Sequence, residues 1–492
     1  RRQRQMCIRD RVGASYREAI VTIIDRQAQT SAERSTHENS VRDIVGIGIG
    51  PGNLGLAVAI EEQAPELDAL FVEARPEFNW HPGMLLEGSN MQISFLKDLV
   101  TVRNPQSRFS FINYLHHSDR LIDFINRQTF TPERVEFADY LRWIADHITV
   151  DTQYNTTVTS IETLPELAAD GARFVVHVRR KLGSGESEGQ RAQQSESIRC
   201  RNVVVARGLE AKMPAWAEDS SLDTSRIFHN IDLLPRTKKL LNSGWDIRRA
   251  LVIGAGQSAA EAIRYFHDCP HIDTVTGSLN SYGFIPADDS PFANRVFDPE
   301  AVDDFFHAPD AIRNELLIRH RYTNYACVES ELLDELHDRQ YRESVTGRQR
   351  LDIRRTTEVL GARNCSDGSV DVDIRHRVTG DVVTENFDVV VCATGFRSRG
   401  LAGIHADSHG SEEFTVTRDY GAVLNGERVP GLFVQGATEA THGLGSTLLS
   451  NIATRSGELV EAITGQQRTH RAPADEDLRS EQHRDSSHLI AG

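Results

Sequence analysis

The folded part of the chain is expected to open with the stretch DIVGIGIGPGNL, residues 43–54. An apolar run leads directly into Gly48-x-Gly50, and a run typical of a helix follows over 54–60. Glycines let a backbone turn sharply and approach a pyrophosphate closely, and the start of a helix offers unpaired N–H groups. The stretch therefore predicts a dinucleotide-binding turn between a strand and a helix.

The glycine pattern can be aligned in two registers. Gly48-x-Gly50-x-x-Asn53 has asparagine in the third place, whereas the register that starts at Gly50 is complete but puts Pro51 inside the turn. We favour the first register because the strand then stops where the turn begins. The next strand-like run, 69–73, ends in Glu73, where an acid can accept a hydrogen bond from a ribose hydroxyl.

A second unit of the same kind lies near the middle of the chain. The stretch ALVIGAGQSAAE, residues 250–261, has an apolar strand, Gly254, Gly256 and a small residue, Ala259, in the third place. A further strand is expected near 272–276, and a cofactor with a 2′-phosphate usually meets a basic residue just after such a strand. Because residues 277–285 contain no Arg or Lys, the choice between NADPH and NADH stays open.

Composition excludes several other classes of protein. The 492 residues carry a formal charge of −16, and a nucleic-acid-binding protein needs clustered Lys and Arg instead. No apolar run is long enough to cross a bilayer. The six cysteines form no C-x-x-C pair, which argues against a zinc ribbon, a redox dithiol and a disulfide framework. We therefore expect no metal site. Because the N-terminus lacks a secretory pattern, we expect a cytoplasmic protein.

Alternating strand-like and helical runs predict an α/β fold with two Rossmann-like dinucleotide-binding domains, the second inserted in the first. A flavin is the natural partner of a nicotinamide, so FAD and NAD(P)H are the expected pair. We expect strands at 203–205 and 389–392 to link the two domains, and a mobile hairpin loop at 181–197. The expected boundaries are an extension at 1–40, an FAD-binding part at 41–211, an NAD(P)H-binding domain at 212–396, an FAD- and substrate-binding part at 397–464 and a disordered tail at 465–492.

Several longer strings carry a family resemblance. They are WHPGMLL at 80–86, MQISFLKDL at 91–99, FSFINYL at 109–115, RVEF at 134–137, DDSPF at 288–292, TNY at 323–325 and THGL at 441–444. Together with the two glycine-rich turns, these strings resemble the flavin-dependent N-hydroxylating monooxygenases of siderophore biosynthesis, in order from residue 42 to about 460.

The resemblance implies a reaction. It implies that NADPH, with NADH as an alternative, reduces FAD, and that O2 then forms a C(4a)-hydroperoxyflavin. The neutral side-chain amine of L-ornithine would attack it to give N(5)-hydroxy-L-ornithine. No side chain needs to act as a nucleophile, so no catalytic residue is assigned. The family also favours a homo-oligomer, with a tetramer as the first expectation.

The resemblance also implies which residues form the site. Lys97 would supply a positive charge for the substrate carboxylate, and Asn294 and Asn324 would supply neutral donors and acceptors. Arg134 is expected on a loop near the flavin. The residues expected to bind FAD are Gly48, Gly50, Pro51, Asn53, Glu73, Trp80, His81, Gln92 and Arg134; those expected to bind NADP are Gly254, Gly256, Gln257, Ser258 and Ala259; and those expected to bind the substrate are Lys97, Asn294, Asn324 and Ser450.

Alternatives of two kinds remain at this point. The substrate of a lysine N(6)-monooxygenase is longer by one methylene, and a pocket discriminates against one methylene by only ~1–3 kcal/mol of binding free energy. A diamine hydroxylase is the other enzyme of this kind, and its substrate would give Lys97 no carboxylate to bind. A protein of another class would bind the flavin without hydroxylating anything, as an NAD(P)H oxidase or a partner subunit.

Overall fold

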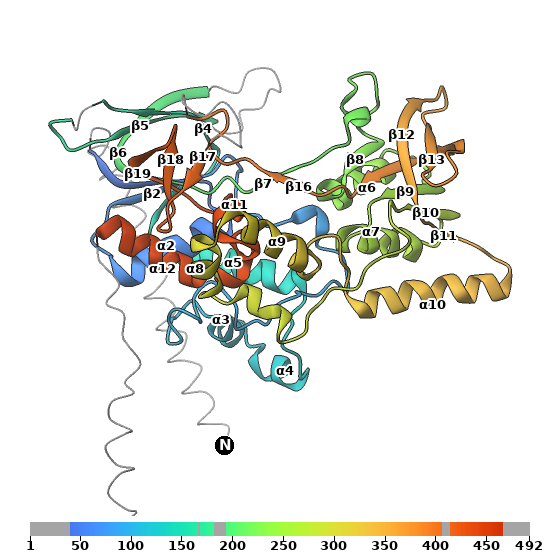
Figure 1. The fold of residues 1–492 in the computed structure, drawn as a ribbon, viewed down its shortest axis with the longest axis horizontal. Helices are drawn as coiled ribbons and strands as arrows, with labels where there is room; N and C mark the ends of the chain where they lie inside the picture. Colours follow the sequence, from blue (N-terminus) through green and yellow to red (C-terminus); the bar gives the residue numbers. More distant parts are fainter. Residues whose placement is uncertain (1–39, 166–167, 182–192, 406–413, 466–492) are drawn as a thin grey trace, which may run out of the picture.

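Two β-sheets organise the chain in the computed structural model, which describes residues 40–165, 168–181, 193–405 and 414–465 (Figure 1). The first sheet has nine strands in the order β17-β18-β19-β6-β1-β2-β3, with β4 joined through β5 to β6. Its strands β19, β6, β1, β2 and β3 are parallel to one another. The strands are β1 (Arg42–Ile47), β2 (Ala69–Val72), β3 (Asp151–Gln153), β4 (Thr156–Thr163), β5 (Phe174–Lys181), β6 (Gln193–Val205), β17 (Phe414–Val416), β18 (Gly421–Leu424) and β19 (Glu427–Val434).

The second sheet has five parallel strands in the order β11-β10-β9-β15-β8. All five lie in sequence between β6 and β17, so the prediction of one Rossmann-like unit inserted in another is confirmed. A three-stranded antiparallel meander, β12 to β14, is inserted between β11 and β15. These strands are β8 (Ile227–His229), β9 (Arg249–Ile253), β10 (Thr274–Ser278), β11 (Leu351–Arg354), β12 (Thr357–Asn364), β13 (Val370–His376), β14 (Val382–Phe387) and β15 (Val389–Cys392).

The chain passes between the two sheets twice, through β7 (Leu209–Ala211) and β16 (Phe396–Ser398), which pair antiparallel with each other. The strands expected to link the domains, 203–205 and 389–392, are the last strands before the two crossings and lead into β7 and β16. Figure 1 shows β7 and β16 spanning the gap between the sheets.

Helices lie below both sheets in the view of Figure 1. The helix α2 (Pro51–Gln63) is buried along residues 53–60 and packs on α12 (Ile452–Thr464). A Cβ on Gly55 would lie 2.5 Å from Cγ2 of Ile452, so only glycine permits this approach. The other helices are α3 (Phe111–His117), α4 (Leu121–Asn126), α5 (Arg134–His147), α6 (Leu233–Asn242), α7 (Gln257–Asp268), α8 (Ala301–His307), α9 (Asp310–His320), α10 (Ser330–Thr346) and α11 (Glu439–His442).

Three local predictions need correction. Lys181 and residues 193–197 belong to the β5–β6 hairpin rather than to a loop, because main-chain pairing extends the strands through polar residues; residues 182–192 lie outside the described part. The strand expected at 272–276 runs from Thr274 to Ser278, since its register follows β9. Arg134 is the first residue of α5 and not a loop residue. The expected extension and tail lie almost wholly outside the described residues.

Candidate functional site

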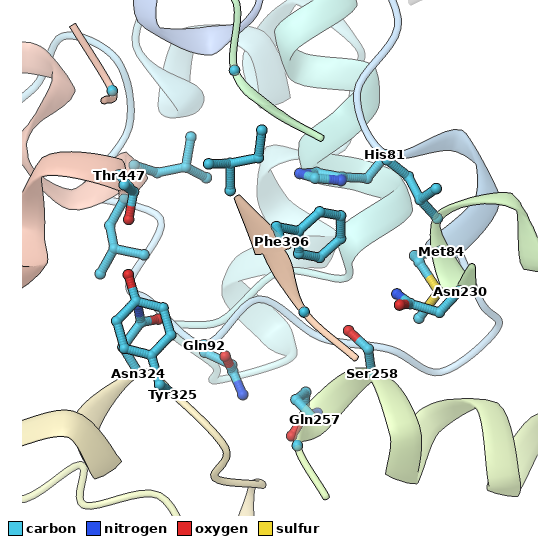
Figure 2. Close-up of a pocket in the computed structure, with 18 of the residues that line it drawn as sticks. His81, Met84, Gln92, Asn230, Gln257, Ser258, Asn324, Tyr325, Phe396 and Thr447 are labelled. Carbon is cyan, nitrogen blue, oxygen red and sulfur yellow. The ribbon is translucent and has the colours of Figure 1, made fainter. Parts of the chain in front are cut away.

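One large cavity lies between the two sheets and is lined by both glycine-rich turns. Its volume is about 2200 Å³, whereas a pocket for one drug-sized ligand has roughly 300–1000 Å³. Figure 2 shows side chains from both Rossmann-like units and from the C-terminal segment around this cavity, among them His81, Ser258 and Thr447. The space therefore fits two dinucleotides and a small substrate together.

The first turn is shaped by Gly48. Its φ is +82°, and a Cβ there would lie 2.6 Å from the carbonyl oxygen of Ala206. Gly50 then precedes α2, and Pro51 is the first helical residue, as the favoured register requires. The N-cap residue, Gly50, has no side chain that could cap the helix, so the first N–H groups of α2 can bind a phosphate.

Two predicted residues hold this turn in place. Asn53 is fully buried behind it and donates to the carbonyl oxygen of Gly48 at 2.7 Å, so Asn53 does not line the cavity. Glu73 does line the cavity, and its Oε2 accepts from the N–H of Ile49 at 3.1 Å. Glu73 thereby fastens the turn to the end of β2 and presents a carboxylate beside it.

The second turn repeats this design. Gly254 has a φ of +143°, and a Cβ there would lie 2.3 Å from the carbonyl oxygen of Ala393. Gly256 precedes α7, and Ser258 and Ala259 line the cavity at the start of that helix. The side chain of Gln257 also lines it, but its amide is already hydrogen-bonded to neighbouring acids.

The segment 80–92 closes the cavity between the turns. His81 has a φ of 46° and begins the short turn Pro82–Met84. Burial, followed by the nearby charges of Arg134 and Arg75, lowers the pKa of His81 to about 4, so the ring is neutral near pH 7. Trp80 packs on Phe137 with ring centroids 5.9 Å apart.

Every residue predicted to bind FAD or NADP lines this cavity, with the exception of Asn53. They include His81, Gln92, Gln257 and Ser258, which are labelled in Figure 2. Trp80 and Arg134 complete the wall on the side of the first sheet. The structure thus gathers residues that are spread over most of the sequence.

The four residues predicted to contact the substrate line the same cavity from four separate segments: Lys97, Asn294, Asn324 and Ser450. Within the described ranges the Lys97 ammonium forms no salt bridge, so its charge is available to a ligand. The following residue, Asp98, is buried and accepts from the N–H groups of Val100 and Phe111, which fixes the loop that carries Lys97.

The sequence did not predict two of the residues that line the cavity, Asn230 and Tyr325. Asn230 follows β8, is 1% exposed, and has no hydrogen-bond partner for either amide atom among the residues with described placement. Figure 2 shows it between Met84 and Ser258. Tyr325, beside Asn324, donates to the Glu439 carboxylate. The position of Asn230 at the carboxyl end of a parallel strand was a usable signal, because ligands bind at that end.

His442 lies outside this group. It is buried, stacks on Tyr420 with ring centroids 4.5 Å apart, and its Nε2 lies 3.1 Å from the carbonyl oxygen of Arg418. It does not line the cavity, which agrees with a structural role.

Two Rossmann-like units with their glycine-rich turns open to one cavity define a two-dinucleotide oxidoreductase. The chain belongs to the L-lysine 6-monooxygenase/L-ornithine 5-monooxygenase family, whose model matches residues 40–398. Across the described residues, no helix is both long and apolar enough to cross a membrane.

Individual relatives agree with this assignment. The chain is 39% identical over 458 residues to the L-ornithine N(5)-oxygenase of Arthrobotrys oligospora. The aligned region covers 88% of this chain and 90% of the relative. A structure of the ornithine N-hydroxylase of Kutzneria sp. 744 with reduced FAD, NADP⁺ and L-ornithine is similar with a TM-score of 0.78 and 37% identity, over 87% of this chain and 99% of that one. The FAD-bound cadaverine monooxygenase of Erwinia amylovora has a TM-score of 0.73 and 26% identity, over 88% and 98%.

Proposed function

We propose that this chain hydroxylates the side-chain amine of L-ornithine with O2, using FAD and NADPH, to give N(5)-hydroxy-L-ornithine for hydroxamate siderophore biosynthesis. The observation that carries the proposal is the single cavity that both glycine-rich turns share with Lys97 and Asn324. The names of the similar ornithine hydroxylases support the choice of substrate.

The two cofactors are assigned to the two turns. The residues of the first turn fit a pyrophosphate because Gly48 admits no side chain and the start of α2 is uncapped. Glu73 would accept from a ribose hydroxyl of FAD, while Gly254, Gly256 and Ser258 would hold NADPH on the opposite wall. Bound FAD, once reduced by NADPH, would supply the activation of O2.

The substrate is a zwitterion with a second amine, and the cavity offers matching groups. Lys97 would bind the carboxylate, and Asn324, Asn294 and Ser450 would bind the α-ammonium group and orient the side chain. A diamine has no carboxylate, so it would leave the Lys97 charge without a partner. This asymmetry favours an amino acid over a diamine.

The protein's remaining tasks are to exclude water and to accept a neutral amine. Neutral His81 and the packed ring of Trp80 would form a wall without an acid that could protonate the amine. Because an alkyl amine has a pKa of about 10.4, turnover should rise with pH across the neutral range.

A product assay tests this function. Hydroxylamine and hydrogen peroxide are measured with ornithine, lysine, putrescine and cadaverine, each with NADPH and with NADH. Hydroxylamine formed chiefly from ornithine supports the proposal. Hydroxylamine chiefly from another amine contradicts the substrate, and complete release of peroxide at saturating ornithine contradicts hydroxylation itself.

We also propose that the protein is cytoplasmic and forms a homo-oligomer, with a tetramer as the first expectation. Several large apolar side chains are exposed on α4, on the segment that follows it and at the start of α5, namely Ile122, Ile125, Phe130 and Val135. A second copy of the chain would cover them. Light scattering on the purified protein measures the oligomeric state, and a monomer would contradict the proposal.

A further inference from the structure

The end of β10 is the place where a nicotinamide domain distinguishes its two cofactors. A 2′-phosphate on the adenosine ribose lies just beyond the second strand of the unit, and a basic residue there selects NADPH. Asn280, just past β10, lines the cavity, but residues 277–285 contain no Arg or Lys. The local sequence therefore leaves the phosphate without a counter-charge.

An arginine from another segment reaches this position. Arg377 follows β13, lines the same cavity, and its Nη1 donates to the carbonyl oxygen of Asn280 at 2.6 Å. The residues around it are joined by main-chain bonds: Arg377 N–H donates to Thr356 at 2.7 Å, and Thr356 N–H donates to Ser281 at 2.8 Å. The guanidinium is thus held beside the end of β10.

The charges nearby leave Arg377 able to bind an anion. Its Nε lies 3.6 Å from Oε2 of Glu358, but Arg375 also pairs with that carboxylate, so two guanidinium groups face one acid. The side chain of Arg377 is 48% exposed. Among the residues with described placement its Nη2 has no hydrogen-bond partner, and a guanidinium carries five N–H donors.

We propose that Arg377 binds the 2′-phosphate of NADPH and gives the enzyme its preference for NADPH over NADH. The inference rests on the proposed function, since it requires that the second turn binds a nicotinamide dinucleotide. Arginine suits the task because its planar donors match a phosphate in a bidentate manner. The meander β12–β14 would then supply the charge that the segment after β10 lacks.

The test compares Arg377→Gln with Arg363→Gln in the FAD-loaded protein. Arg363 lies on β12 of the same meander, pairs with Asp373 at 2.6 Å and does not line the cavity, so its variant removes the same charge elsewhere. We expect Arg377→Gln to lower kcat/KM for NADPH by about tenfold or more and to leave kcat/KM for NADH unchanged. Arg377→Lys should recover part of the loss for NADPH. Arg363→Gln should change neither.

Calorimetry provides a readout that does not depend on turnover. Wild-type protein should bind 2′,5′-ADP more tightly than 5′-AMP, which lacks only the 2′-phosphate, and Arg377→Gln should remove that difference. An unchanged affinity of Arg377→Gln for 2′,5′-ADP overturns the inference, as does an equal loss for NADPH and NADH, which would mark Arg377 as a structural tether. If wild-type protein binds 2′,5′-ADP but makes no hydroxyornithine, the proposed function fails while this inference stands.

Discussion

Arg134 and Glu261 form a two-pronged ion pair between the two Rossmann-like units. Nη2 of Arg134 lies 2.7 Å from Oε1 of Glu261, and Nη1 lies 2.9 Å from Oε2. Burial opposes the charge on Arg134, but the hydrogen bonds and negative charge of Glu261 outweigh it and raise the pKa of the guanidinium. The first residue of α5 is thus fastened to α7 at the wall of the cavity.

Removing the carboxylate should destabilise the contact between the units. Glu261→Gln leaves a buried guanidinium without its counter-charge, which costs about 3–5 kcal/mol of unfolding free energy in buried pairs. Chemical denaturation should therefore show an earlier transition for this variant. Glu315→Gln breaks an exposed helical pair with Arg319 and should change stability by less than about 1 kcal/mol. Equal losses of unfolding free energy for the two substitutions would show that the buried pair stabilises the protein no more than the exposed pair does.

Gly48→Ala should prevent FAD binding. The new Cβ would press on the carbonyl oxygen of Ala206, and the φ of +82° is unfavourable for alanine as well. Gly88→Ala is the matched control, since Gly88 has a φ of +69° but open space around its Cβ position. The flavin absorbance of the purified proteins measures the outcome. Full flavin content in Gly48→Ala would contradict the assignment of FAD to this turn.

Lys97→Met should impair the use of ornithine and spare the reduction of the flavin. Loss of a charged partner for the carboxylate is expected to lower kcat/KM for ornithine by about tenfold to a hundredfold. Putrescine turnover should change little, because that amine has no carboxylate. Lys239→Met, at an exposed position of α6, removes the same charge away from the cavity. Parallel losses for ornithine and putrescine would rule out a carboxylate contact.

Much of this organisation could be predicted from the sequence because it depends on local patterns. Gly48 and Gly254 stand where strand and helix signals meet, and the structure gives both a positive φ. The position of Arg134 could not be predicted so well, because its partner Glu261 comes from a distant helix. Asn53 illustrates a different limit: an asparagine in a glycine-rich turn looks like a ligand-binding residue, yet tertiary packing turns its amide toward main-chain carbonyls.

Buried histidines should make the folded state sensitive to acid. Burial, the largest cause, lowers the pKa of His442 from 6.5 to about 4, so the unfolded chain binds this proton more readily than the folded one. Stability contributed by the neutral ring is complete above pH 6.5 and is lost as the pH falls toward 4. The loss should be on the order of 3 kcal/mol for this residue.

Replacing the ring isolates this contribution. His442→Gln can still donate to the carbonyl oxygen of Arg418, although it loses the stacking on Tyr420, so the variant should be less stable at every pH. The informative quantity is the slope: the unfolding free energy of His442→Gln should fall less steeply between pH 6.5 and 4 than that of the wild type. His116→Gln, at an exposed site on α3, should keep the wild-type slope. An unaltered slope in His442→Gln would mean that the acid sensitivity arises from other groups.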